Sequence, residues 1–132
     1  MSLQLGRVYT RQQISDMLGG SIQAYLPVAS GRVTCGCFVP GPAMNPNAPD
    51  EVLFGRPDES PDINKAADLV FSQGQVGEAI PVFLKLDKGE WEFRGEYLCI
   101  GITRDERVVR RKMIEYPSRG QFHGVLRFER VA

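Results

Sequence analysis

The sequence predicts an α+β domain in which a small, strongly curved antiparallel sheet or β-barrel carries two or three short helices. Three observations support this prediction. A strong β-hairpin, centred on Asp87-Lys88-Gly89, dominates the chain. About five strand-like segments are mixed with short helical ones, without the regular repeat of a doubly wound parallel sheet. The 132 residues are 42% hydrophobic, which suffices for one core and predicts a single domain over residues 1–132.

The first predicted element is a short helix that begins after Thr10. Thr10 and Gln13 form a capping-box pattern, in which the Thr hydroxyl serves a free N–H and the Gln side chain reaches back. Three apolar residues then recur at helical spacing: Ile14, Met17 and Leu18. Gly19-Gly20 offers a left-handed cap that ends the helix. Residues 21–30 are predicted to form an irregular connection, broken at Pro27.

Residues 32–39 alternate as one strand. Four small or apolar side chains share a face: Val33, Cys35, Cys37 and Val39. Gly36 within this strand predicts a bulge or the close approach of another backbone or a ligand. Residues 40–50 contain four prolines, which fix φ and predict a stiff loop. A short strand over residues 51–55 follows.

A second helix follows the polar loop of residues 56–61. Asp62 is its predicted cap and Gly74 its predicted end. The helical period is continued by Ala66, Leu69, Val70 and Gln73. The hairpin arms are residues 80–86 and 90–102, and Gly89 supplies the left-handed position of the turn.

The second hairpin arm is a half-buried alternating strand. Its apolar face is predicted to carry Trp91, Phe93, Tyr97 and Cys99, with Gly95 in the middle of the strand. Charged residues occupy the other face: Glu90, Glu92, Arg94 and Glu96. A last strand is predicted over residues 124–131.

The charge balance excludes one class of protein. Sixteen Lys and Arg balance sixteen Asp and Glu, so the chain lacks the overall basic excess of an obligate nucleic-acid binder. Residues 31–102 hold six basic and eleven acidic side chains, whereas residues 103–132 hold eight basic and four acidic ones. Any attraction to phosphate is therefore expected to be local.

A basic stretch, residues 104–112, is expected to form a short helix. Three- and four-residue spacing places Arg107, Arg110 and Arg111 on one side of it. This side is either a solvated helix face or a patch that meets phosphate or another acidic partner. The candidate phosphate-binding residues are Arg104, Arg107, Arg110, Arg111 and Lys112.

Several functions are disfavoured. There is no apolar run long enough for a membrane span, and the first residues lack the apolar stretch of a secretory signal, so we expect a cytoplasmic protein without a membrane partner. Three cysteines in no zinc-finger spacing, and the absence of the common catalytic and phosphate-loop motifs, predict no metal, no cofactor and no catalytic residue. Cys35 or Cys37 acting with His123 is the route that remains to an enzyme.

A set of aromatic and amide side chains suits the recognition of an unpaired base. Flat side chains stack on a base while polar groups read its edge. The candidate ligand-binding residues are Tyr25, Phe38, Asn45, Asn47, Trp91 and Tyr97. The alternative is that the aromatic residues are core and that the two asparagines make Asx-turns.

Four segments carry a resemblance to a known family: Gly6–Arg11 with the helix ending at Met17-Leu18-Gly19, the loop Asn45–Pro49, Ile80–Phe83, and Trp91–Tyr97. The chain resembles a bacterial domain family related to the PUA superfamily, which includes the EVE and SRA readers of modified bases. Members occur alone or joined to nuclease and helicase modules of restriction type. The resemblance implies a compact PUA-like β-barrel with an aromatic pocket for a modified or extruded base. Trp91, Tyr97 and the Asn45–Pro49 loop match it, without an assigned base contact.

We therefore expect a non-enzymatic module that binds DNA or RNA, with a separately encoded nuclease or helicase as a partner. The sequence leaves the oligomeric state open. The alternative is a small-molecule or protein-interaction domain whose site is framed by residues 40–49. A Cys-dependent enzyme ranks behind both.

Overall fold

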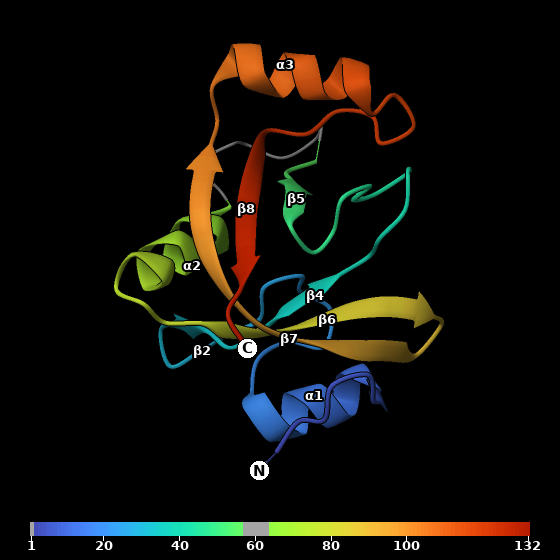
Figure 1. The fold of residues 1–132 in the computed structure, drawn as a ribbon, viewed down its shortest axis with the longest axis vertical. Coiled ribbons are helices and arrows are strands. Elements are labelled where there is room, and N and C mark those ends of the chain that lie inside the picture. The colour runs from blue at the N-terminus through green and yellow to red at the C-terminus, as the bar shows by residue number, and fades with distance from the viewer. Residues whose placement is uncertain (1, 57–63) are drawn as a thin grey trace.

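The computed structural model describes residues 2–56 and 64–132, which form three helices around a curved six-stranded sheet (Figure 1). The helices are α1 (Arg11–Leu18), α2 (Lys65–Gln75) and α3 (Glu106–Glu115). The sheet strands are β1 (Val8–Tyr9), β4 (Gly36–Phe38), β5 (Glu51–Phe54), β6 (Ile80–Asp87), β7 (Glu90–Thr103) and β8 (Gly124–Arg130). A separate two-stranded ribbon is made by β2 (Val28–Ala29) and β3 (Arg32–Val33). The α+β class is confirmed.

Strand β7 is the axis of the sheet. Its first half pairs with β6 on one side and with β1 on the other, and its second half pairs with β8. Strand β4 adds to β6 in parallel and β5 adds to β8 antiparallel, so the order is β4-β6-β7-β8-β5. In Figure 1 the β6–β7 hairpin lies across the molecule, while the end of β7 turns upward beside β8 towards α3. The sheet is thus curled and open, with β4 and β5 as edges.

The predicted single apolar face of β7 is wrong, because a bulge divides it. Phe83 is opposite Phe93 but Val82 is opposite Gly95, so Arg94 is an extra residue and Gly95 takes a φ of +119°. A bulge of this kind reverses the alternation of side chains that follow it. Trp91 and Phe93 consequently belong to one core, and Tyr97 and Cys99 belong to another.

Three clusters of buried side chains fill the molecule. The largest lies between α2 and the sheet and includes Phe38, Val70, Val82, Tyr97 and Phe128. The second lies between α1 and the β6–β7 hairpin and includes Tyr9, Ile14, Phe83, Trp91 and Phe93. The third lies under α3 and contains Leu53, Val109, Tyr116, Phe122 and Val125.

The predicted strand over residues 32–39 divides into β3 and β4. Its first part pairs with β2 and its second part with β6, so the two parts belong to different sheets. Two backbone hydrogen bonds to the segment before β2 stabilise this separation: Thr34 N–H donates to the Pro27 carbonyl, and Cys37 N–H donates to the Tyr25 carbonyl. Gly36 is closely approached, but by the Phe38 ring, which would lie 2.5 Å from a Cβ there, and not by the other backbone or ligand that was predicted.

Local signals located α1 and the β6–β7 hairpin, whereas β1 was not predicted and β2 lies in residues 21–30, which were predicted to be irregular. The capping box of Thr10 and Gln13 is present, α1 ends at Leu18, and the β6–β7 turn has Gly89 at a φ of +73°. The predicted cap Asp62 lies outside the described residues. Within the described part of the chain, none of the helices has the length and apolar character that a membrane crossing requires.

Helix α2 continues through Gly74, which corrects its predicted end. Gly74 lies where α2 packs on β7, and a Cβ added to it would lie 2.0 Å from the Cys99 carbonyl oxygen. The preceding residue, Gln73, buries its amide and exchanges two hydrogen bonds with the Val33 backbone, at 2.7 and 3.1 Å. Helix α2 therefore has Gly74 at its closest contact with β7, and it is hydrogen-bonded to β3 through the buried Gln73 amide.

Gly74→Ala is expected to lower the free energy of unfolding by about 1–3 kcal/mol, the usual cost of overpacking. In an exposed helix interior the same change stabilises by about 0.5–1 kcal/mol. Urea unfolding followed by circular dichroism measures the difference. Ser72→Ala, at an exposed position of α2, is the control and should change stability by less than about 0.5 kcal/mol. A Gly74→Ala variant as stable as the unmodified protein would contradict the close contact with β7.

Candidate functional site

A cavity of about 370 Å³ lies between β4, β5 and the segment that precedes β2. We call it the Tyr25 pocket. Its described lining comprises Gln23, Ala24, Tyr25, Cys37, Phe38, Val39, Met44, Asn45, Leu53, Phe54, Gly55, Arg56, Asn64 and Arg119. Phe38 and Phe54 are almost completely buried and close its inner end, whereas Tyr25 and Met44 are more exposed. The pocket is thus largely apolar and aromatic, with a few polar groups, as small-molecule sites usually are.

Tyr25 is held in place from both sides. Its carbonyl oxygen accepts a hydrogen bond from Cys37 N–H of β4, at 2.8 Å, and its hydroxyl donates to Asn64 Oδ1. The segment before it is fixed by Arg11, whose Nη2 donates to the Ser21 and Ala24 carbonyls, at 3.0 and 2.6 Å. An irregular connection is therefore rigid at the residue that lines the pocket.

Asn45 joins the two edge strands beside this pocket. Its Nδ2 donates to the Val39 carbonyl just after β4, at 3.1 Å, and its Oδ1 accepts from Leu53 N–H of β5, at 2.8 Å. Both ends of the amide are therefore occupied by the protein. The side chain shapes the pocket and leaves only spare hydrogen-bonding capacity for a ligand.

The structure brings three of the six predicted ligand-binding residues together: Tyr25, Phe38 and Asn45. Asn47 lies outside this pocket, where its Nδ2 donates to the Tyr116 hydroxyl, at 2.6 Å. Tyr97 is 5% exposed in the core under α2. Trp91 is 7% exposed in the core next to α1. Neither of these two residues lines the Tyr25 pocket.

Trp91 lies beneath two cations. The Arg11 guanidinium is 5.1 Å and the Lys85 ammonium 5.9 Å from the ring centroid. Such stacking orients the guanidinium that also holds the Ala24 carbonyl. Trp91 therefore affects the Tyr25 pocket only indirectly, through the Arg11 guanidinium that stacks on it.

The five predicted phosphate-binding residues lie on or just before α3, in two groups. Arg104 makes a bidentate ion pair with Asp68, at 2.8 and 3.1 Å, and lies 5.1 Å from the Phe54 ring centroid. Lys112 pairs with Glu51 at 2.8 Å. The exposed group is Arg107, Arg110 and Arg111, of which Arg110 contacts Glu106 at 2.9 Å.

Tyr116 ties the end of α3 to the proline-rich loop. Its hydroxyl donates to Glu51 Oε1 at 2.9 Å and accepts from Asn47 Nδ2, while the Lys112 ammonium lies 5.5 Å from its ring. Burial, together with the hydrogen bond to Glu51, raises the pKa of Tyr116 to about 12. The network fixes α3 relative to β5, which lines the pocket.

Sequence reasoning missed several lining residues, above all Phe54, Arg56, Asn64 and Arg119. Phe54 reads as an ordinary strand residue and Arg119 as part of a loop. The one available signal was the basic excess of residues 103–132, to which Arg119 contributes. Their meeting depends on where the loops fold, which the local sequence does not specify.

The cysteines are buried thiols away from the histidine. Cys35 Sγ and Cys37 Sγ lie 3.9 Å apart in the core next to α1, and the hydrogen bond to Cys35 together with burial raises the pKa of Cys37. His123 instead places Nε2 2.7 Å from the Arg56 carbonyl oxygen. In the described part of the chain no group of three or more His, Cys, Asp or Glu is arranged to hold a metal ion.

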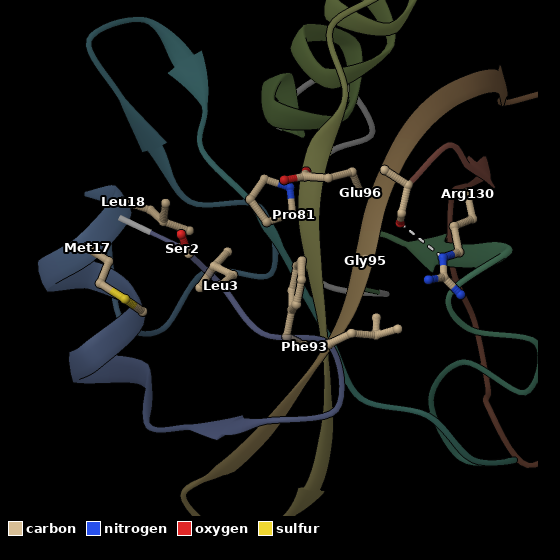
Figure 2. Close-up of a pocket in the computed structure, with 11 residues that line it drawn as sticks. Ser2, Leu3, Met17, Leu18, Pro81, Phe93, Gly95, Glu96 and Arg130 are labelled. Atoms are coloured by element: carbon tan, nitrogen blue, oxygen red, sulfur yellow. Dashed lines mark hydrogen bonds between the residues drawn. The ribbon is translucent and has the colours of Figure 1, made fainter.

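A second cavity, of about 500 Å³, lies between α1 and the β6–β7 hairpin (Figure 2). Leu3, Met17 and Leu18 face Pro81 and Phe93 across it, and Arg130 Nε donates to the Ala132 carbonyl, at 3.0 Å. Burial raises the pKa of Glu96 at its edge. This cavity lacks the stacked aromatic and amide residues that the sequence singled out.

Two of the solved structures to which this chain is similar contain SRA domains. No protein-family model and no curated protein matches the chain. The SUVH5 SRA domain in complex with hemimethylated CG DNA matches with a TM-score of 0.65 and 9% identity, over 99% of this chain and 90% of that one. A structure of the sulfur-binding and SRA domains of ScoMcrA with phosphorothioated DNA matches with a TM-score of 0.55 and 16% identity, over 97% and 39%. ScoMcrA itself, a Type IV phosphorothioation-dependent restriction endonuclease, gives 0.52 and 21%, over 77% and 22%.

The chain therefore shares the fold of these SRA structures, with a sheet that is curled and open and not closed into a barrel. It spans less than two fifths of the ScoMcrA chains that it matches. These identities are low enough that the likeness establishes the fold alone.

Tyr116→Phe is expected to destabilise the protein by about 1–3 kcal/mol at neutral pH, because Asn47 Nδ2 and Glu51 Oε1 both lose a buried partner. The difference from the unmodified protein should shrink as the pH rises from 10 towards 12. In that range the unfolded tyrosine, with its ordinary pKa of 10.0, releases its proton before the folded one does, so the folded state loses stability. Urea unfolding of both proteins at several pH values measures this. A difference that stays constant to pH 12 would contradict the raised pKa.

Proposed function

We propose that the chain is a non-enzymatic nucleic-acid-binding module. It takes an unpaired base, natural or modified, into the Tyr25 pocket and meets phosphates with the exposed face of α3. The observation that carries the proposal is the adjacency of these two features. Arg104 at the start of α3 lies over the Phe54 ring, and Phe54 lines the pocket.

The pocket suits a flat ring. Base stacking on an aromatic side chain contributes about 1–3 kcal/mol per base and tolerates different bases, since every base has a π-face. Tyr25 supplies a half-buried aromatic wall whose backbone is hydrogen-bonded to β4, and Phe38 and Phe54 supply a buried apolar end. An extruded base pays only a few kcal/mol for unstacking, least where it is damaged or unpaired.

The α3 surface suits phosphate. Arg107, Arg110 and Arg111 are exposed, and residues 103–132 hold eight basic against four acidic side chains. Arg104 and Lys112 are instead committed to Asp68 and Glu51. We therefore propose that the exposed trio makes the phosphate contacts, while the two paired cations position α3 beside the pocket.

The neighbours in fold support the class of ligand. Two of them are complexes with modified DNA, hemimethylated in one case and phosphorothioated in the other. A third is a restriction endonuclease. We propose that this module likewise reads modified DNA for an effector nuclease or helicase, and that it does so as a single domain in the cytoplasm.

A small-molecule role is the alternative that the same pocket supports. Met44 and Asn45, from the loop predicted to frame such a site, line it. Thermal stabilisation by metabolites without stabilisation by oligonucleotides would favour this alternative.

Removal of α3 charge is expected to weaken DNA binding without regard to sequence. In the double variant Arg107→Gln, Arg111→Gln, the slope of log affinity against log salt should become less negative by about 2, one for each lost phosphate contact. Fluorescence anisotropy of labelled single- and double-stranded DNA and RNA at several salt concentrations measures the slope. The double variant Arg7→Gln, Lys88→Gln is the charge-matched control, because both residues are exposed and neither lies on α3; Lys88 is in the turn of the β6–β7 hairpin, away from α3 (Figure 1). An equal effect of both variants would refute the assignment to α3.

Removal of the pocket wall is expected to weaken binding through the base. Tyr25→Ala should cost about 1–3 kcal/mol of stacking, whereas Tyr25→Phe keeps the ring and should cost less. Oligonucleotides with cytosine or 5-methylcytosine at one site, tested against both variants by the same anisotropy assay, separate base recognition from backbone contact. Unchanged affinity of Tyr25→Ala for every oligonucleotide would rule out this pocket as the base site.

A further inference from the structure

Arg119 lines the Tyr25 pocket and is not used by the function proposed above. Its Nη1 makes one long hydrogen bond, to the Gln121 carbonyl at 3.3 Å, and the guanidinium lies 5.6 Å from the Phe122 ring centroid. Its Nε is buried and has no hydrogen-bond partner among the described residues. A buried donor left unsatisfied is uncommon, because it costs about 1–3 kcal/mol of desolvation.

Arg119 makes no ion pair with a carboxylate among the residues described, a property that it shares with Arg111 of α3 but not with three other cations of this region. Arg104, Arg110 and Lys112 each contact an acidic side chain within 3 Å. Burial lowers the pKa of Arg119, as expected for a guanidinium whose charge is not balanced nearby. The pocket thus contains a guanidinium that has an unused N–H donor and no carboxylate beside it among the described residues.

The described lining of the Tyr25 pocket includes the guanidinium of Arg119 and no carboxylate. Four other cavities each include at least one carboxylate, from Glu96, Glu51, Glu106 and Asp16 respectively. An anionic group is therefore favoured in the Tyr25 pocket above these four cavities.

We propose that Arg119 is the phosphate receptor of the Tyr25 pocket, so that the pocket binds a whole nucleotide and not a base alone. The guanidinium presents a planar set of donors that matches the oxygens of phosphate. The aromatic lining takes the base, and Arg119 takes a phosphate of the same nucleotide, either within a strand or as a free mononucleotide. This inference rests on the proposed function for the base and adds a second recognised group.

The test compares nucleosides with nucleotides. The full chain is titrated by calorimetry with 2′-deoxycytidine, 5-methyl-2′-deoxycytidine and their 5′-monophosphates, and with inorganic phosphate. A hydrogen bond to a charged group contributes about 1.5–3 kcal/mol, so the monophosphates should bind at least about tenfold more tightly than the nucleosides. In Arg119→Gln this advantage should disappear, and Arg119→Lys should restore part of it.

Arg7→Gln is the matched control. Arg7 is exposed and also stacks on an aromatic ring, with its guanidinium 5.4 Å from the Tyr9 centroid, but it does not line the Tyr25 pocket. It should leave the preference for monophosphates unchanged. Thermal unfolding of each variant separates loss of binding from loss of fold, and the Lys variant serves should the Gln variant unfold.

The same variants on a short labelled oligonucleotide separate the two ideas. Monophosphates that bind no better than nucleosides, with oligonucleotide affinity unaffected by Arg119→Gln, overturn the role of Arg119 and leave the proposed function intact. Arg119-dependent monophosphate binding without oligonucleotide binding overturns the proposed function and leaves the phosphate receptor. Absence of both kinds of binding in the unmodified protein overturns both.

Discussion

The amide of Asn45 bridges the two ends of the curled sheet. Its Nδ2 donates to the carbonyl after β4, and its Oδ1 accepts from an N–H of β5. Strands β4 and β5 are the two edges of the sheet, and β6, β7 and β8 lie between them. A curled sheet that does not close needs such a connection to keep its edges at a fixed separation, because edge strands make ladder hydrogen bonds on one side only. The width of the Tyr25 pocket, which lies between these strands, depends on this bridge. Asn45 is therefore a positioning residue of the site whatever else it contacts.

The same loop is fastened a second time from the opposite side. Asn47 donates to the Tyr116 hydroxyl. Glu51 accepts a hydrogen bond from that hydroxyl and pairs with the Lys112 ammonium, so α3 and the proline-rich loop are fixed to each other. On the far side of the pocket, Arg11 holds the carbonyl before Tyr25 while it stacks on Trp91. The pocket thus joins segments that are distant in sequence, and it is supported by Asn45, which lines it, and by side chains such as Arg11 and Tyr116, which do not.

Features specified by neighbouring residues could be read from the sequence, and those specified by distant contacts could not. The cap at Thr10 and the turn at Asp87-Lys88-Gly89 each depend on a few adjacent residues, and both are present. The bulge at Arg94 and Gly95 left the alternation of apolar residues unbroken, because Trp91 and Phe93 before it enter the core next to α1, while Tyr97 and Cys99 after it enter the core under α2. Part of the site could be predicted, because Tyr25, Phe38 and Asn45 were identified from their residue types. Arg119 could not, because it reaches the pocket from a loop whose path depends on the packing of Phe122 and Tyr116 under α3.

The bridge at Asn45 also bears on the solubility of the chain. An edge strand with open N–H and C=O groups can recruit the edge of another molecule and start aggregation. Here one acceptor beyond β4 and one donor of β5 are satisfied by the same amide, and the stiff loop of residues 40–50 runs between the two edges. The segment that shapes the Tyr25 pocket therefore also protects part of both edges from pairing with another chain. A substitution in this segment changes the shape of the pocket and the exposure of the sheet edges together.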